Sequence, residues 1–149
     1  MNYIFVVNDL RIGSTSLSGV DIVDELLEKE LWVYSYNAPL VNRLRVDDRV
    51  LVYIAGPRHR WFEGSFRIAG NVTAGRRPVQ LNPILERMFP LWSPIREIQR
   101  WSRPVPAIEV IPHLEFIKDK RYWGLHFRQS VKQINDRDYE LIVALAAKA

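Results

Sequence analysis

The sequence contains no cysteine among its 149 residues. This absence excludes disulfide bonds, thiol catalysis and cysteine-based zinc sites, and it suits an intracellular protein. No apolar run approaches the ~18 residues that a membrane-spanning helix needs, so we expect no membrane partner. The first residues, MNYIFVVNDLRIG, lack the basic segment and the small-residue cleavage site of a signal peptide. The expected location is therefore cytoplasmic.

Histidine is also scarce, with His59, His113 and His126 as its only occurrences. These three residues lie far apart and share no metal-ligand spacing, so the sequence predicts no metal site. Ser14 and Ser16 lie in a loop without the strand-turn-serine-helix pattern of a catalytic nucleophile. We therefore predict no catalytic residue and no cofactor.

Two other patterns could carry chemistry, and each has a simpler interpretation. The acidic pairs Asp47/Asp48 and Asp136/Asp138 resemble a turn and a helix start, and acid-base catalysis would require burial that neither pair is predicted to have. The loop Gly13–Ser16 could hold a phosphate with backbone amides. It lacks the lysine and the spacing of a nucleotide-binding loop, which favours an ordinary entry into a helix.

The composition is that of a soluble globular protein, with 48% hydrophobic and 26% charged residues. The chain is long enough for one domain with a substantial core, and we predict a single domain over residues 1–149. A net charge of +4 and a pI of about 9.6 favour a polyanionic partner. Many small soluble proteins share this balance, so composition alone leaves the partner open.

The residue pattern predicts a mixture of strands and helices. Strands are expected at 3–8, 49–54, 62–72 and 95–101, with a short one starting at Trp32, and helices at 20–29, 40–44, 82–88 and 139–147. Residues 9–17, 89–94 and 104–112 are expected to be irregular, and 126–134 partly helical. Because irregular turns rather than regular helices link the strands, an α+β fold with an antiparallel or mixed barrel is favoured over a doubly wound sheet.

Several single residues carry local expectations. Ser18 with Asp21, and Asn135 with Asp138, form candidate capping pairs at two helix starts. Glycines at positions 64 and 70 mark a bend or a close approach of two backbones.

The aromatic residues allow two interpretations. Most of the five tryptophans are expected in the core, because each buries a large area. Trp32, however, begins a stretch in which two ring-bearing strands flank a basic loop, and such a surface suits a nucleobase attached to a phosphate. Basic residues alternate with rings at 58–61 and 118–123, either as solvated loops or as a nucleic-acid surface.

Three stretches carry a resemblance to a known family. The first is Trp32 followed by Asn37, Asn42 and Leu44; the second is the strand 48–53 followed by Ile68-Ala69-Gly70; the third is a tail at 114–118, 123–127 and 138–142. Together they resemble the EVE domain, a member of the PUA-like superfamily and a relative of the YTH domain. The tail is similar to small archaeal single-domain EVE proteins. Val33 and Tyr34 depart from the family pattern, which often has Asp-Gly or Gly-Val after the tryptophan.

The resemblance implies a PUA-like pseudo-β-barrel surrounded by several helices, with an aromatic cage that accepts a modified base. By position, Trp32 would be the stacking wall, Asn37 a polar reader or a brace for its loop, and Tyr53 a further pocket residue. Asn8, at the end of the first strand, is a candidate for contacting a base edge. We add Tyr34 because it replaces a small residue beside Trp32.

Stacking on one ring contributes ~1–3 kcal/mol per base, and extruding a base costs a few kcal/mol. Hydrogen bonds to the base edge and phosphate contacts must therefore supply the net affinity. The candidate cations for the phosphate contacts are Arg58, Arg60, Arg76, Arg77, Lys118, Lys120 and Arg121.

The predicted function is a non-enzymatic nucleic-acid-binding module that reads a modified base in DNA or RNA. The principal alternative is a binder of a free modified nucleoside or another planar ligand. An enzyme acting on a nucleotide, or a protein-interaction module that exposes Trp92 and Trp101, are two further alternatives.

Overall fold

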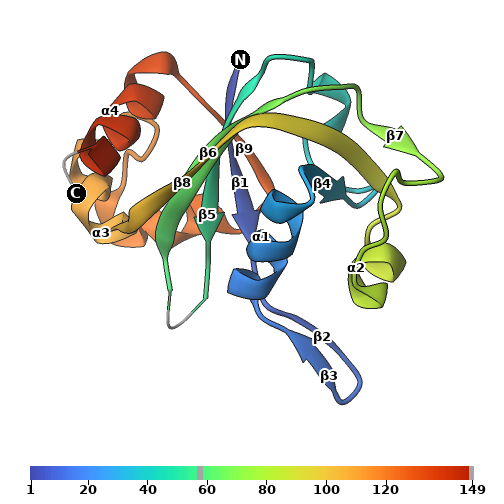
Figure 1. Cartoon of the computed structure of the whole chain (residues 1–149). Coiled ribbons are helices and arrows are strands. Elements are labelled where there is room, and N and C mark those ends of the chain that lie inside the picture. Colours follow the sequence, from blue (N-terminus) through green and yellow to red (C-terminus); the bar gives the residue numbers. More distant parts are fainter. Residues whose placement is uncertain (57–58, 148–149) are drawn as a thin grey trace.

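A curved mixed sheet runs through the computed structural model, which describes residues 1–56 and 59–147 (Figure 1). The strands follow the order β4 (Leu31–Tyr34), β8 (Leu91–Pro106), β6 (Trp61–Ile68), β5 (Arg49–Ile54), β1 (Asn2–Val7) and β9 (Val131–Ile134), and β7 (Thr73–Ala74) also pairs with β8. β1 and β5 are parallel, and the other pairs in this sheet are antiparallel. The predicted α+β class and the mixed sheet are confirmed.

Helices cover both faces of the sheet (Figure 1). α1 (Gly19–Glu28) and α2 (Pro83–Met88) pack on one face, in an apolar cluster that also includes residues of β4. α3 (Ala107–Val110) and α4 (Asp136–Ala147) pack on the other face. The short 3₁₀ helices η1 (Val41–Arg43), η2 (Ile111–His113) and η3 (Lys120–Phe127) lie in the connections. The chain therefore builds two apolar clusters, separated by the sheet.

Strand β5 shows how the sequence supplies both clusters. Val50, Val52 and Ile54 join the cluster under α1, whereas Leu51 and Tyr53 join the cluster under α3 and α4. Successive side chains of a strand point to opposite faces, so this alternation follows from the extended backbone alone. Neighbouring residues of one strand consequently serve different sides of the molecule.

Polar side chains define the helix starts. Ser18 Oγ accepts a hydrogen bond from the Asp21 N–H at 3.1 Å, and Asn135 Oδ1 accepts one from the Asp138 N–H at 2.7 Å. Each bond satisfies one of the amide donors that a helix start leaves without a partner. Both predicted capping pairs are confirmed.

Four segments differ from the prediction. The expected loop at 9–17 is a hairpin of β2 (Leu10–Ile12) and β3 (Thr15–Leu17), which projects from the body in Figure 1. Residues 131–134 form strand β9 rather than a helical segment, because they complete the sheet beside β1. Residues 107–110 are helical rather than irregular.

The fourth segment was predicted to be irregular because it contains several prolines. Residues 91–94 and 104–106 belong to the single long strand β8. Proline cannot donate to a strand ladder, but its carbonyl still accepts, and Pro94 receives the Ala69 N–H at 2.9 Å. A strand can therefore continue through a position where no donor is needed.

Gly64 and Gly70 lie where the prediction expected close approach. A Cβ at Gly64 would stand 2.2 Å from the Gln99 carbonyl oxygen, and one at Gly70 would stand 2.7 Å from Pro94 Cγ. The register of β6 against β8 shifts next to Gly64, so this glycine lets the two backbones touch at a bulge. Close backbone approach is confirmed at Gly64, and at Gly70 the chain bends beside the Pro94 side chain.

Among the described residues, no helix has the length and the apolar character needed to cross a membrane.

Candidate functional site

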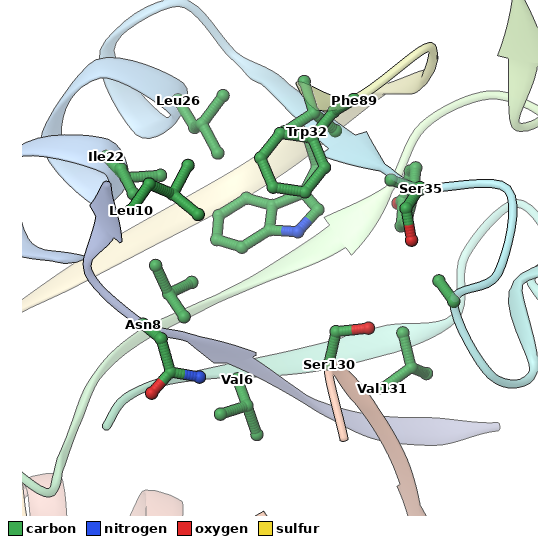
Figure 2. Close-up of a pocket in the computed structure, with 14 residues that line it drawn as sticks. Val6, Asn8, Leu10, Ile22, Leu26, Trp32, Ser35, Phe89, Ser130 and Val131 are labelled. Atoms are coloured by element: carbon green, nitrogen blue, oxygen red, sulfur yellow. The ribbon is translucent and has the colours of Figure 1, made fainter. Parts of the chain in front are cut away.

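A cavity of about 180 Å³ lies beside Trp32, between β1, α1 and β4. Figure 2 shows the indole in the middle of the group, with Leu10, Ile22, Leu26 and Phe89 on one side and Asn8 and Ser130 on the other. The cavity is lined by Val6, Val7, Asn8, Leu10, Ile22, Leu26, Trp32, Val33, Tyr34, Ser35, Ala38, Phe89, Ser130 and Val131.

Trp32 serves both the core and the cavity. The residue is only 5% exposed, and its ring packs on Phe5 at 5.8 Å and on Phe66 at 5.2 Å, measured between ring centroids. These contacts from β1 and β6 fix the plane of the indole, and the cavity borders the same side chain. Trp32 is therefore a core residue that also lines the cavity, and its role as a stacking wall for a base stays a prediction.

Tyr34 contributes its ring but not a free hydroxyl. Its hydroxyl shares a hydrogen bond of 2.8 Å with Ser93 Oγ, and both residues are buried. Burial raises the pKa of Tyr34 well above the ordinary tyrosine value, and the bond to Ser93 opposes that shift only in part. The phenol is thus a neutral part of the wall.

The polar groups at the cavity are Asn8, Ser35 and Ser130. They come from the end of β1, from the loop after β4 and from the segment before β9. An amide offers both donors and an acceptor, and each hydroxyl offers one donor and acceptor lone pairs. A planar guest in this cavity would therefore meet apolar walls and a few hydrogen-bonding groups at its edge.

Two predicted pocket residues are not brought to this cavity. Asn37 is exposed in the loop after β4, and its neighbours Ser35 and Ala38 line the cavity instead. Tyr53 belongs to the opposite face of the sheet, because it alternates with Val52 and Ile54 along β5. It borders a second hollow.

The sequence analysis missed Leu10, Phe89 and Ser130. Each belongs to a segment expected to be irregular or helical, and each reaches the cavity only through the tertiary fold. Phe89 is the C-cap residue of α2, and the Arg77 guanidinium donates a hydrogen bond to its carbonyl oxygen. An aromatic side chain within an apolar segment was the one local signal for Phe89.

The predicted phosphate-binding cations are spread over several surfaces. Arg60 and Arg121 border the second hollow, and Arg76 and Lys118 are exposed elsewhere. Arg77 donates to the Phe89 carbonyl oxygen, and the Lys120 ammonium donates to the Leu114 and Ile117 carbonyl oxygens. Arg58 lies outside the described residues.

Two exposed arginines lie close in sequence to residues that line the cavity. Arg11 follows Leu10 in the hairpin, and Arg128 stands two residues before Ser130. Neither forms an ion pair with any residue in the two described ranges. These two cations were not among the sequence candidates.

The burial of the acidic pairs Asp47/Asp48 and Asp136/Asp138 differs from the prediction. Asp48 is 5% exposed and Asp138 is fully buried, whereas Asp47 and Asp136 are exposed, so the prediction was wrong for one carboxylate of each pair. Asp48 accepts the Arg45 N–H at 2.8 Å, and Asp138 accepts the N–H groups of Glu115 and Phe116 at 3.0 and 3.1 Å. These bonds fix loops, and neither carboxylate lines the cavity.

Trp61, Trp92, Trp101 and Trp123 are each partly buried, so Trp32 is the most enclosed of the five. No group of three possible metal ligands occurs within residues 1–56 and 59–147.

Matches to known sequences differ in extent. The sequence model described as "EVE domain" matches residues 17–145. A curated protein from Bacillus licheniformis, described as "UPF0310 protein in gntR 5'region", is 44% identical over 46 residues. That local match spans 31% of this chain and 31% of the relative's own length.

Solved structures with the same fold include three of different description. Human THYN1 in complex with DNA containing 5-methylcytosine has a TM-score of 0.62 at 12% identity, over 99% of this chain and 98% of that one. The YTH domain of Zygosaccharomyces rouxii MRB1 in complex with N6-methyladenosine RNA has 0.62 at 12%, over 97% and 86%. An ASCH protein from Zymomonas mobilis has 0.63 at 11%, over 97% and 94%. At these identities the likeness establishes the fold.

Proposed function

The chain belongs to the EVE domain family and has a PUA-like fold, and from this premise we propose that it binds nucleic acid and reads a modified base beside Trp32. The observation that carries the proposal is the cavity of about 180 Å³ with an indole in its wall. Two proteins of the same fold are described in complexes with methylated DNA and methylated RNA, which supports the same class of ligand here.

The lining suits a base that carries an added methyl group. Leu10, Ile22 and Leu26 supply apolar contacts, and each CH₂-sized group buried contributes about 0.8 kcal/mol. One buried methyl would therefore favour the modified base roughly fourfold over its parent. Asn8 and Ser130 supply donors and acceptors for the base edge.

The cavity supports binding rather than catalysis. Within the described part of the chain its lining includes no aspartate, glutamate, histidine, lysine or arginine. The one titratable side chain, Tyr34, is hydrogen-bonded to Ser93 and has a raised pKa. General acid-base chemistry needs a group that can exchange a proton near the operating pH, and this lining offers none.

Phosphate contacts would come from cations near the cavity segments. Arg11 and Arg128 are exposed and close in sequence to Leu10 and Ser130. Such contacts raise the affinity for any strand without carrying sequence information. A free modified nucleoside would occupy the same cavity without them, and this is the second candidate function.

The test is fluorescence anisotropy with labelled DNA and RNA strands that contain 5-methylcytosine, N6-methyladenosine or only unmodified bases. We expect one modified strand to bind roughly fourfold or more tightly than its unmodified match. Leu10→Trp, which fills the cavity and leaves Trp32 in the core, should abolish that preference. Trp101→Phe, on the other face of the sheet, is the matched control.

Salt separates the two candidates. The affinity for a strand should fall steeply as the salt concentration rises, because binding releases counterions, whereas a neutral nucleoside should show little change. Equal affinity of the parent protein for every modified and unmodified strand would contradict the proposal.

A further inference from the structure

The face of the sheet opposite the Trp32 cavity carries a second hollow, of about 480 Å³. It lies between the end of β5, the start of β6 and η3. Its lining is Tyr53, Ala55, Gly56, Arg60, Arg121, Trp123, Gly124 and Phe127. This combination of cations and rings differs from the uncharged lining of the Trp32 cavity.

Three rings form a continuous aromatic wall in this hollow. Phe127 stacks on Tyr53 with centroids 4.3 Å apart and planes at 23°, and Trp123 meets Phe127 edge to face at 5.9 Å. Tyr53 and Phe127 are buried, whereas Trp123 is only partly covered. Trp123 is therefore the one ring of the three with substantial exposed area, which makes it the candidate for stacking on a planar group.

Two guanidinium groups border the hollow, and neither has a carboxylate partner among the described residues. Arg60 and Arg121 are exposed, and neither forms an ion pair with a carboxylate in the described residues. No acidic residue belongs to the described lining. Arginine forks match the geometry of a phosphate and bind it with paired, charge-assisted hydrogen bonds.

The backbone of Arg60 is held in a conformation that favours glycine. Its φ is 74°, which costs a bulky residue energy and persists only where neighbours fix it. The Arg60 N–H donates to the Ile54 carbonyl oxygen at 2.9 Å, and its own carbonyl accepts the Ala107 N–H at 2.8 Å. These bonds fix the backbone at this position, and the Arg60 Nε donates to the Gly56 carbonyl oxygen at 3.3 Å.

The Tyr53 hydroxyl remains a neutral donor beside these cations. Burial raises the pKa of Tyr53 to about 12, although the nearby charge of Arg60 lowers it in part. A protonated phenol can donate a hydrogen bond to an anionic oxygen at neutral pH.

We propose that this hollow is a second binding site, specific for a nucleotide, with the phosphate on Arg60 and Arg121 and the base stacked on Trp123. The ligand is a phosphate-bearing nucleotide, either free or at the end of a strand. The site is independent of the Trp32 cavity, because the sheet separates the two.

The experiment is isothermal titration calorimetry of the full chain with adenosine 5′-monophosphate, adenosine and inorganic phosphate at low salt. We expect the nucleotide to bind about tenfold or more tightly than either fragment, since each fragment lacks one of the two sets of contacts. Equal binding of adenosine, or equal binding of inorganic phosphate, would overturn the assignment to a nucleotide.

Substitutions in the lining of the second hollow test whether the nucleotide binds there. Arg121→Gln and Trp123→Leu should each weaken the nucleotide about fivefold or more, while the exposed Arg76→Gln, the matched control, should leave it unchanged. Circular dichroism checks that each variant folds. Unchanged affinity in Arg121→Gln, a change the exposed surface should tolerate, would refute the site.

Two further measurements distinguish the two binding sites and distinguish a free nucleotide from a strand end. Leu10→Trp should leave nucleotide binding intact whatever it does to modified strands, so either proposal can fail without the other. Displacement of the mononucleotide by a 5′-phosphorylated short strand, but not by its 5′-hydroxyl match, would identify a strand end as the source. Displacement by neither would identify the free nucleotide.

Discussion

The hydroxyls of Tyr34 and Ser93 lie 2.8 Å apart in a fully buried hydrogen bond between β4 and β8. Ser93 is also the residue opposite Trp32 in the strand register. The bond therefore fixes the short strand that carries the indole against the longest strand of the sheet.

Removing one partner of this bond should destabilise the protein. Tyr34→Phe leaves the buried Ser93 hydroxyl without a partner, and we expect the free energy of unfolding to fall by roughly 1–3 kcal/mol. Urea denaturation measures it. The double variant Tyr34→Phe/Ser93→Ala should lose less than the sum of its single variants, because both remove the same bond. A Tyr34→Phe protein as stable as the parent would show that the bond contributes nothing.

Gly64 should not tolerate a side chain. A Cβ there would stand 2.2 Å from the Gln99 carbonyl oxygen, so Gly64→Ala must push β6 and β8 apart. Overpacking of this kind costs about 1–3 kcal/mol, which thermal denaturation would report as a lower Tm. Gly124→Ala is the matched control, because nothing lies within 4 Å of its Cβ position. Equal Tm values for the two variants would contradict the bulge as described.

Asp138 should matter for stability although it lines neither cavity. Its carboxylate accepts the Glu115 and Phe116 N–H groups and is fully buried. Asp138→Asn keeps the shape but replaces one of the two acceptor oxygens with an NH₂ donor, so one of these N–H groups loses its acceptor, and we expect a loss of roughly 1.5–3 kcal/mol in urea denaturation. Asp21→Asn, at an exposed position of α1, should change little. If both variants lose equally little, the buried carboxylate has no such role.

The sequence predicted what local chemistry determines. Ser18 and Asn135 mark helix starts because their side chains bond to amides three residues away. Gly64 marks a close approach because only glycine fits there. Trp32 was identified because it begins a sequence pattern that resembles the EVE domain. The EVE match over residues 17–145 confirms that resemblance.

The pocket was predicted only in part, because its walls come from distant segments. Phe89 and Ser130 reach Trp32 through the packing of α2 and β9, and no local spacing encodes that meeting. Tyr53 shows the opposite problem. It follows Trp32 in the same family pattern, but strand alternation places it on the other face of the sheet. A pattern in sequence order does not by itself place side chains on one surface.

His126 gives a prediction about pH. The ring is partly buried against Phe116, and Lys132 Nζ lies 3.5 Å from its Nδ1. Burial, followed by the charges of Lys132 and Lys120, lowers the pKa of His126 below the ordinary histidine value. An NMR titration of the ring C–H signals should show this, and Lys132→Gln should move the pKa back upward. Lys118→Gln, which removes a lysine outside this cluster, should leave it unchanged.

The same shift makes stability depend on pH in one direction. In the folded chain His126 stays neutral at a pH where the unfolded chain already binds the proton, at about 6.5. The stability that this residue contributes is therefore complete above about pH 6.5 and is lost as the pH falls through the lower pKa of the folded state. His126→Gln should flatten the decline of the unfolding free energy between about pH 7 and 5 relative to the parent. A folded-state titration at or above the ordinary value, or a variant with the parent's full decline, would show that burial and the two lysines do not control this histidine.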